Sequence, residues 1–197
     1  MCTYFVVASH RDRDAAEGDF HRIAAIHDEG ALGNLDAVVL ARAASGALGF
    51  AIGADGDPND GIGCGLARGL ALALSPGVSQ RWEPNDDASR AAAGIVVDRV
   101  AAAVGRGDLR RYGLLLDAAA AALVASTSSE RADVVAATLS PSDALASGHV
   151  RLDRSALAEE VRRAVRTARP AGESAPAEAI APTQTGPTSH RSRGGPR

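Results

Sequence analysis

Three oxygen-bearing side chains at alternate positions, Asp55, Asp57 and Asn59, could supply ligands to a divalent cation. An EF-type calcium loop takes oxygen ligands from its first, third and fifth positions, and this segment matches those three positions. However, Asp60 stands where such a loop needs glycine for its sharp turn, and Leu66 stands where it needs a bidentate glutamate. We therefore favour a solvated acidic turn, with a cation-binding loop as the alternative.

The segment that follows, Gly61 to Leu74, is rich in glycine and apolar residues. It lacks the Gly-Lys-Ser/Thr of a phosphate-binding loop, and its third glycine comes one place too late for a dinucleotide-binding fingerprint. As a helix it would place Gly61, Gly65 and Gly69 on one side, where another helix could approach closely. The expected partner is the Ala-rich helix at residues 88–104, in the same chain or in a second copy.

The length of this segment argues against a membrane-spanning helix. About 14 residues at about 1.5 Å each give about 21 Å, which is short of a hydrocarbon core of about 30 Å. Arg68 also places a charge inside the segment. Packing against another helix is the favoured interpretation, and shallow contact with a membrane surface is the second.

The histidines and nucleophilic side chains show no catalytic spacing. His21 and His27 are six residues apart, so they do not share a helix face as a metal-binding pair at positions i and i+4 would. His10 lies beside Arg11 near the start of a predicted helix, where a turn residue is a simpler interpretation than an anion ligand. We expect no catalytic residue and no cofactor, and hence a protein that is not an enzyme.

Composition limits the partners. The 197 residues carry a formal net charge of −3, which does not indicate the clustered basic face of a nucleic-acid-binding protein. Cys2 and Cys64 are too few for a disulfide framework, and the first residues lack the basic region of a signal peptide. We expect a cytoplasmic protein, with membrane association as an additional expectation.

Hydrophobic periodicity predicts strands and helices in a mixed order. The run Ala121–Ser126 is ambiguous, because alanine favours helix while its position between a helix stop and a new helix cap favours strand; we choose strand. In the strand at 47–53, Leu48, Phe50 and Ile52 are expected on one face. The predicted strands are 4–8, 35–42, 47–53, 121–126 and 148–152. The predicted helices are 14–28, 88–104, 108–117, 130–139 and one that starts at Asp153 or Ser155.

These elements predict a single α+β domain at residues 1–169. Strand, helix and hairpin in the first part form the first half of a ferredoxin-like βαββαβ core. A Gly/Ala-rich helical hairpin at 61–104 is inserted after the third strand. Residues 170–197 are rich in proline, glycine and serine without periodicity, so we expect a disordered tail.

Two segments resemble a known family. The opening Phe5-Val6-Val7-Ala8-Ser9-His10-Arg11-Asp12-Arg13-Asp14-Ala15-Ala16-Glu17-Gly18-Asp19-Phe20 and the later Gly105-Arg106-Gly107-Asp108-Leu109-Arg110-Arg111-Tyr112-Gly113-Leu114-Leu115-Leu116-Asp117 are similar to the bacterial domain-of-unknown-function family 1269. The resemblance covers about residues 4–152. It implies a small α+β domain that is often labelled a membrane protein, and it implies no enzyme activity. The Gly-rich segment of this chain is shorter than the family pattern and is interrupted by Arg68.

Two functions follow as hypotheses. The first is a non-enzymatic structural or interaction protein that self-associates, or binds a membrane surface, through its Gly/Ala-rich helices. The alternative is a sensor domain for a small ligand or a divalent cation, which would use the loop Asp55–Asn59. We expect a homo-oligomer under the first hypothesis.

Overall fold

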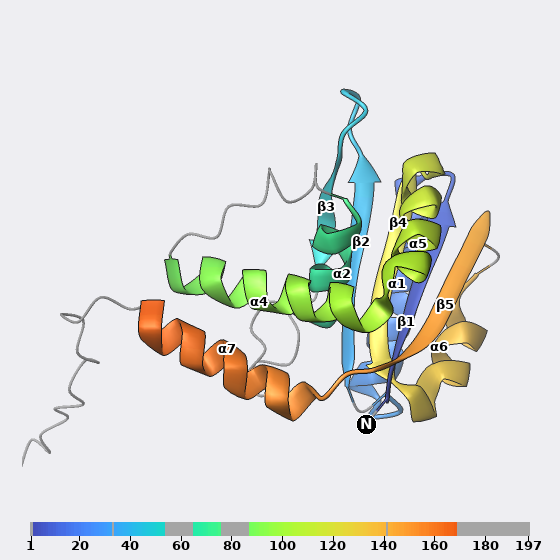
Figure 1. Cartoon of the computed structure of the whole chain (residues 1–197). Coiled ribbons are helices and arrows are strands. Elements are labelled where there is room, and N and C mark those ends of the chain that lie inside the picture. Colours follow the sequence, from blue (N-terminus) through green and yellow to red (C-terminus); the bar gives the residue numbers. More distant parts are fainter. Residues whose placement is uncertain (1, 33, 54–64, 76–86, 141, 169–197) are drawn as a thin grey trace, which may run out of the picture.

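The computed structural model describes residues 2–32, 34–53, 65–75, 87–140 and 142–168. The chain is α+β, with an antiparallel sheet of order β3-β2-β4-β1-β5 and helices on both of its faces (Figure 1). The strands are β1 (Cys2–His10), β2 (Leu35–Arg42), β3 (Leu48–Gly53), β4 (Ala121–Ser128) and β5 (Ala144–Arg151). The helices are α1 (Arg13–Asp28), α2 (Leu66–Leu74), α4 (Asp87–Val104), α5 (Arg106–Ala118), η1 (Ser129–Arg131), α6 (Ala132–Thr138) and α7 (Arg154–Ala168).

The three inner strands are buried on both faces of the sheet. Residues 3–10 of β1, 35–40 of β2 and 121–127 of β4 are all buried. The prediction of a strand at 121–126 is confirmed, although alanine favours helix, because small and β-branched side chains fit a strand covered by helices on both sides. Tertiary position thus overrides local propensity in β4.

The order of the strands differs from the expected four-strand unit. The hairpin β2–β3 forms as predicted, but among the described residues β3 lies at the edge of the sheet, where its one partner is β2. The inner place between β2 and β1 belongs to β4, which is separated from β2 in sequence by residues 43–120. The sheet therefore has five strands, with β3 and β5 at its two edges.

A β-bulge in the β2–β3 ladder places Phe50 and Ile52 of β3 on opposite faces of the sheet. Val39 pairs with Ile52 while Leu40 pairs with Phe50, so Ala51 is the additional residue in the ladder. A bulge shifts the alternation of side chains. As a result Phe50 packs with the core under α2, and Ile52 packs with the core on the opposite face, so the expectation that both lie on one face is wrong.

One face of the sheet is covered by α1 and α6. Ala16, Phe20 and Ile23 of α1 are buried there, at the helical spacing that the sequence predicts. The helix begins after Asp12, whose side chain accepts a hydrogen bond from the Ala15 N–H at 2.8 Å. Asp12 is therefore the N-cap, and Asp14 lies within the first turn of the helix.

The opposite face carries α2, α4 and α5, and α7 packs along α4. Val96 and Val100 of α4 are fully buried and lie four residues apart on one face of the helix. Figure 1 shows α4 and α7 side by side, extending beyond the sheet. A bidentate ion pair joins them, with Arg99 Nε and Glu160 Oε2 2.8 Å apart. This pair raises the pKa of Arg99 and lowers that of Glu160, because the hydrogen bonds between the two side chains favour the charged form of each, and their opposite charges add to this.

The helix α5 meets the edge strand β5 at a close contact between Tyr112 and Gly148. Tyr112 is 1% exposed, and burial raises the pKa of its phenol above the ordinary value of 10.0. A β-carbon built on Gly148 would lie 2.8 Å from the Tyr112 hydroxyl oxygen, which is closer than real β-carbons approach. Glycine at position 148 is therefore what allows α5 to lie over β5.

We expect Gly148→Ala to destabilise the chain by about 1–3 kcal/mol, because the added methyl group overpacks a buried site. Removing the hydroxyl should relieve the clash, so Tyr112→Phe/Gly148→Ala should lose less stability than the sum of its single variants. Urea unfolding followed by circular dichroism measures both effects. Strictly additive losses would show that the hydroxyl contact does not limit this packing.

Candidate functional site

Two of the three glycines expected on one helix face, Gly65 and Gly69, lie in the described residues, and they have different roles. The helix α2 begins at Leu66, and Gly65 precedes it as the N-cap with a φ of 72°, a conformation that favours glycine. Gly65 and Gly69 therefore do not share a helix face. Gly61 lies outside the described residues, as do the three candidate cation ligands Asp55, Asp57 and Asn59.

Gly69 faces the helix α4 of the same chain. A β-carbon at this position would lie 2.6 Å from Val96 Cγ1 and 3.6 Å from Val100 Cγ2. Most of α2 is buried, including Leu66, Ala67 and Leu70 on the sheet side. The close helix approach that the glycines predicted is therefore made by Gly69 within the chain.

A buried carboxylate that the sequence analysis did not single out holds the start of α2. Asp36 lies in β2, is 1% exposed, and its Oδ2 accepts a hydrogen bond from the Ala67 N–H at 2.5 Å. A β-carbon on Gly65 would lie 2.5 Å from the same oxygen. The first N–H groups of a helix carry partial positive charge, so a carboxylate at this place is stabilised. The available signal was an aspartate inside the apolar run of β2.

A second buried cluster lies on the opposite face, where β1 ends. His10 Nε2 lies 3.4 Å from Asp19 Oδ2, with the two side chains 2% and 0% exposed. The other carboxylate oxygen, Oδ1, accepts hydrogen bonds from the Ser140 N–H at 3.0 Å, the Ser140 hydroxyl at 2.8 Å and the guanidinium of Arg22. Asp19 thus joins α1 to β1 and to the segment that follows α6.

This cluster contains the residue types of a serine–histidine–aspartate triad in a different order. In a catalytic triad the imidazole lies between the hydroxyl and the carboxylate, so that it can take the proton of the serine. Here the carboxylate of Asp19 lies between Ser140 and His10. The arrangement can orient and hold these groups, but the His10 imidazole does not lie between the other two groups, as the base of a triad does.

An exposed serine–histidine pair lies on β5 and η1. His149 Nδ1 is 3.0 Å from Ser129 Oγ, and the imidazole ring packs against Tyr4 with 5.0 Å between ring centroids. An activated hydroxyl also needs a third group that orients the base. The contact that the structure gives to this imidazole is the Tyr4 ring, which fixes its plane but does not stabilise an imidazolium as a carboxylate would.

The described residues contain no group of three or more His, Cys, Asp or Glu side chains arranged to hold a metal ion. None of their helices is both long enough and apolar enough to cross a bilayer. A shallow hollow lies beside the β2–β3 hairpin, lined mainly by alanine and glycine. The guanidinium of Arg42 at this hollow donates hydrogen bonds to the carbonyls of Leu116, Asp117 and Ala119, so it is engaged in capping the end of α5.

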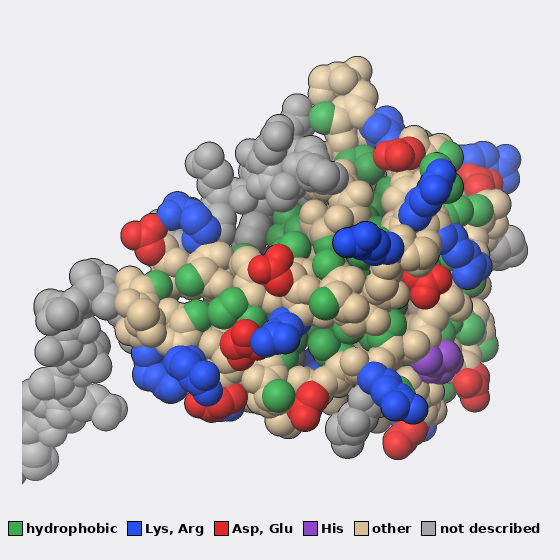
Figure 2. All heavy atoms as spheres, viewed as in Figure 1, with side chains coloured by type: hydrophobic (Ala, Val, Ile, Leu, Met, Phe, Trp, Pro, Cys, Tyr) green, Lys and Arg blue, Asp and Glu red, His purple; other side chains and the backbone are tan. Residues whose placement is uncertain are grey.

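Charges of both signs are mixed over the face shown in Figure 2. Arginine and acidic side chains alternate there, and apolar atoms lie between them. Such a surface provides no large field of one sign that would attract a polyanion. Ion pairs such as Arg90–Asp87 and Arg162–Glu159 join neighbouring turns of single helices, which is typical of solvated helix faces.

Comparison with protein-family models, with curated proteins and with solved structures found no match to this chain.

The contact of Gly69 with α4 predicts a cost for any side chain at that position. We expect Gly69→Ala to destabilise the chain by about 1–3 kcal/mol, because the methyl group would overlap Val96. The matched control is Gly94→Ala on α4, where the added atom meets open space and helix propensity should increase stability by up to about 1 kcal/mol. Thermal unfolding of both variants measures the difference, and equal effects would contradict the packing described here.

We predict a larger loss of stability when the buried carboxylate of Asp19 is removed. We expect Asp19→Ala to cost about 3–5 kcal/mol, because it leaves the Ser140 N–H and the Arg22 guanidinium without their acceptor and removes the carboxylate that lies 3.4 Å from His10. Ser140→Ala removes one of the donors and should cost about 1 kcal/mol. Chemical denaturation of the two variants provides the comparison. A loss at Asp19 no larger than that at Ser140 would show that the carboxylate does not join these elements.

Proposed function

We propose that this chain is a non-enzymatic structural or interaction protein that functions by associating with a second copy of itself. The observation that carries the proposal is the open strand at the edge of the sheet. Within the described residues β5 pairs only with β1, and it exposes Leu145, whose exposure is 43%. An unpaired strand edge with exposed apolar side chains favours pairing with another chain.

We place the association at the sheet rather than at the Gly/Ala-rich helices. Gly69 already contacts Val96, and α2 is largely buried under α4. Gly69, one of the three glycines that indicated self-association, is therefore used for packing inside the chain. The edge strand β5 has backbone donors and acceptors on the side away from β1, where the described residues contain no paired strand.

We further propose that four of the strands form a ferredoxin-like core. Taken in chain order, β1, α1, β2, β4, α6 and β5 follow a βαββαβ pattern, and their order in the sheet is β2-β4-β1-β5. In this proposal β3, α2, α4 and α5 are an insertion between the second and third core strands, and α7 is an addition. The similarity of residues 4–152 to the domain-of-unknown-function family 1269 is consistent with such a core and remains a proposal.

We propose a cytoplasmic location, with contact to a membrane surface as an additional property of the assembled protein. Among the described residues, the largest fully buried side chains include Phe5, Ile23 and Leu123, and the large apolar side chains that are exposed are Leu114 and Leu145. Contact with a membrane would therefore use the surface of the folded protein and not a spanning helix.

The proposal predicts a discrete oligomer in solution. Light scattering coupled to size-exclusion chromatography should give a mass of about 40 kDa, twice the 20.0 kDa of one chain, which decreases on dilution. The same measurement with liposomes tests the membrane contact separately. A strict monomer at high concentration would overturn the proposal, and a thermal shift with divalent cations would favour the sensor function instead.

A further inference from the structure

We propose that the second copy pairs antiparallel along β5, around a two-fold axis at Ser147, and that Asp143 of each copy forms an ion pair with Arg151 of the other. This inference rests on the proposed function, because it names the surface and the contacts by which the chain would associate. It joins the two sheets into one continuous sheet. The argument uses the direction of the backbone groups, the register and the charges at the ends of β5.

The direction of the backbone groups in β5 follows from a hydrogen bond two strands away. The Arg42 N–H donates to the Ala120 carbonyl at 2.8 Å. The backbone N–H and C=O groups of the even-numbered residues of β4 therefore point toward β2. Backbone donors and acceptors alternate along an antiparallel strand. The register pairs His10 of β1 with Ala121 of β4, so the backbone groups of the even-numbered residues of β1 face β4 and those of the odd-numbered residues face β5. Phe5 pairs with Gly148, so the even-numbered residues of β5 bond to β1, and the backbone groups of the odd-numbered residues point away from it.

The outward residues of β5 are therefore Leu145, Ser147, His149 and Arg151. Their side chains lie on the α1/α6 face of the sheet, on the side opposite to Ala146 and Val150, which belong to the core under α5 and α7. Ser147 is half-buried and the other three are exposed. A second strand can thus reach both the free backbone groups and a row of accessible side chains.

The charges at the ends of β5 distinguish between two registers, centred on Ser147 and on Gly148, in which the α1/α6 faces of the two sheets lie on the same side. With Ser147 opposite Ser147 of the second copy, Leu145 lies opposite His149. Asp143, which directly precedes β5 and donates its N–H to the Ser9 carbonyl, then comes beside Arg151 at both ends of the interface. Centring the pairing on Gly148 would instead oppose Asp143 to Asp153, two carboxylates. Opposite charges across an antiparallel pair are stabilising, while like charges are destabilising.

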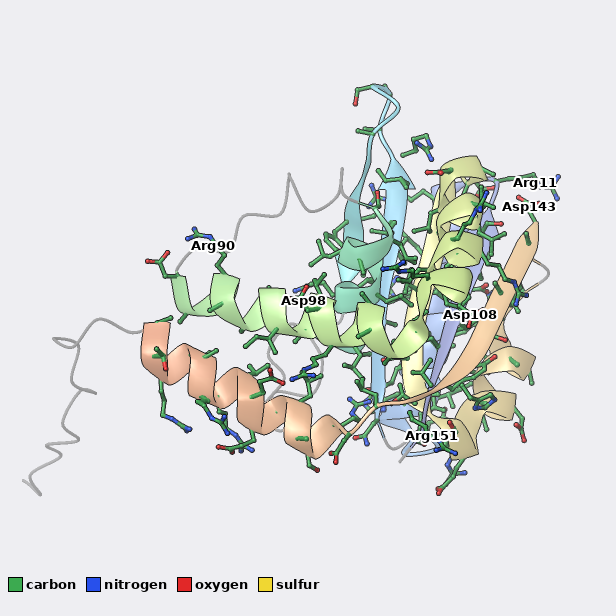
Figure 3. The ribbon with its side chains drawn as sticks, in the orientation of Figure 1. Arg11, Arg90, Asp98, Asp108, Asp143 and Arg151 are labelled. Carbon is green, nitrogen blue, oxygen red and sulfur yellow. The ribbon has the colours of Figure 1, made fainter. Side chains whose placement is uncertain are left out.

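Asp143 and Arg151 are positioned for these contacts. Figure 3 shows them at opposite ends of β5, with Arg11 beside Asp143. The Arg11 Nε lies 3.0 Å from Asp143 Oδ1, and the Asp143 side chain is 41% exposed. The carboxylate therefore retains room for a second guanidinium, and Arg151 is exposed at the far end of the strand. Each interface end would hold one carboxylate between two arginines.

A charge exchange tests the ion pairs. Arg151→Asp places a carboxylate opposite Asp143 at both ends, and we expect it to raise the dimer dissociation constant about tenfold or more at low salt. The double variant Asp143→Arg/Arg151→Asp restores opposite charges and should recover most of the affinity. The matched control is Arg110→Asp on the exposed side of α5, which should change the constant less than about threefold. Sedimentation equilibrium gives all four values, and circular dichroism checks that each variant is folded.

A cysteine at the two-fold axis tests the register. In a Cys2→Ser/Cys64→Ser background, Ser147→Cys should form an intermolecular disulfide under mild oxidation, because paired residues in adjacent strands have suitable Cα separations. Leu145→Cys, which would face His149, should form far less. Equal or absent crosslinking at both positions would overturn the register.

The outcomes separate this inference from the proposed function. A dimer whose affinity does not respond to Arg151→Asp, and which is not crosslinked through Ser147→Cys, would overturn the β5 interface while leaving self-association in place. A chain that is monomeric in every variant and in the parent would overturn both. Weakening by the single variant, rescue by the double variant and crosslinking at Ser147 would together support the inference.

Discussion

The ladder between β2 and β4 is the interaction on which the rest of the structure depends. It pairs residues 35–41 with residues 121–127. The ladder thus brings together two strands between which β3, α2, α4 and α5 lie in the sequence. Bringing such distant segments together costs loop-closure entropy, which the burial of both strands on two faces must offset. Val38 and Val124, which pair in this ladder, are fully buried in the core that they share with α2, α4 and α5.

This ladder also decides which strands are left at the edges. Because β4 occupies the place beside β2, the hairpin strand β3 is displaced to one side, and β5 closes the other side next to β1. The Gly/Ala-rich helix α2 then becomes an internal layer between the sheet and α4. The Asp36 carboxylate accepts a hydrogen bond from the start of α2, and Gly69 in the middle of the helix allows close contact with α4. Small residues in the sequence can therefore indicate packing inside one chain as well as between chains.

Much of the secondary structure could be predicted from the sequence, because it depends on local periodicity and capping. The strand at β1, the apolar stripe of α1 and the stripe of α4 at Ala92, Val96 and Val100 all follow from residue spacing. The strand order could not be predicted, since no local pattern identifies the neighbour of β4. The bulge that places Ile52 on the opposite face, and the contact of His10 with Asp19, also follow from no periodic pattern in the sequence.

Amide hydrogen exchange of β5 tests the central claim, that this edge is the association surface, most directly. The N–H groups of Leu145, Ser147, His149 and Arg151 point away from β1, so in a monomer they are open to water, whereas in the proposed dimer they are hydrogen-bonded. The account predicts that their exchange slows with increasing protein concentration, while the even-numbered amides, already bonded to β1, change little. Fast exchange of these four amides at concentrations where a dimer mass is measured would contradict it.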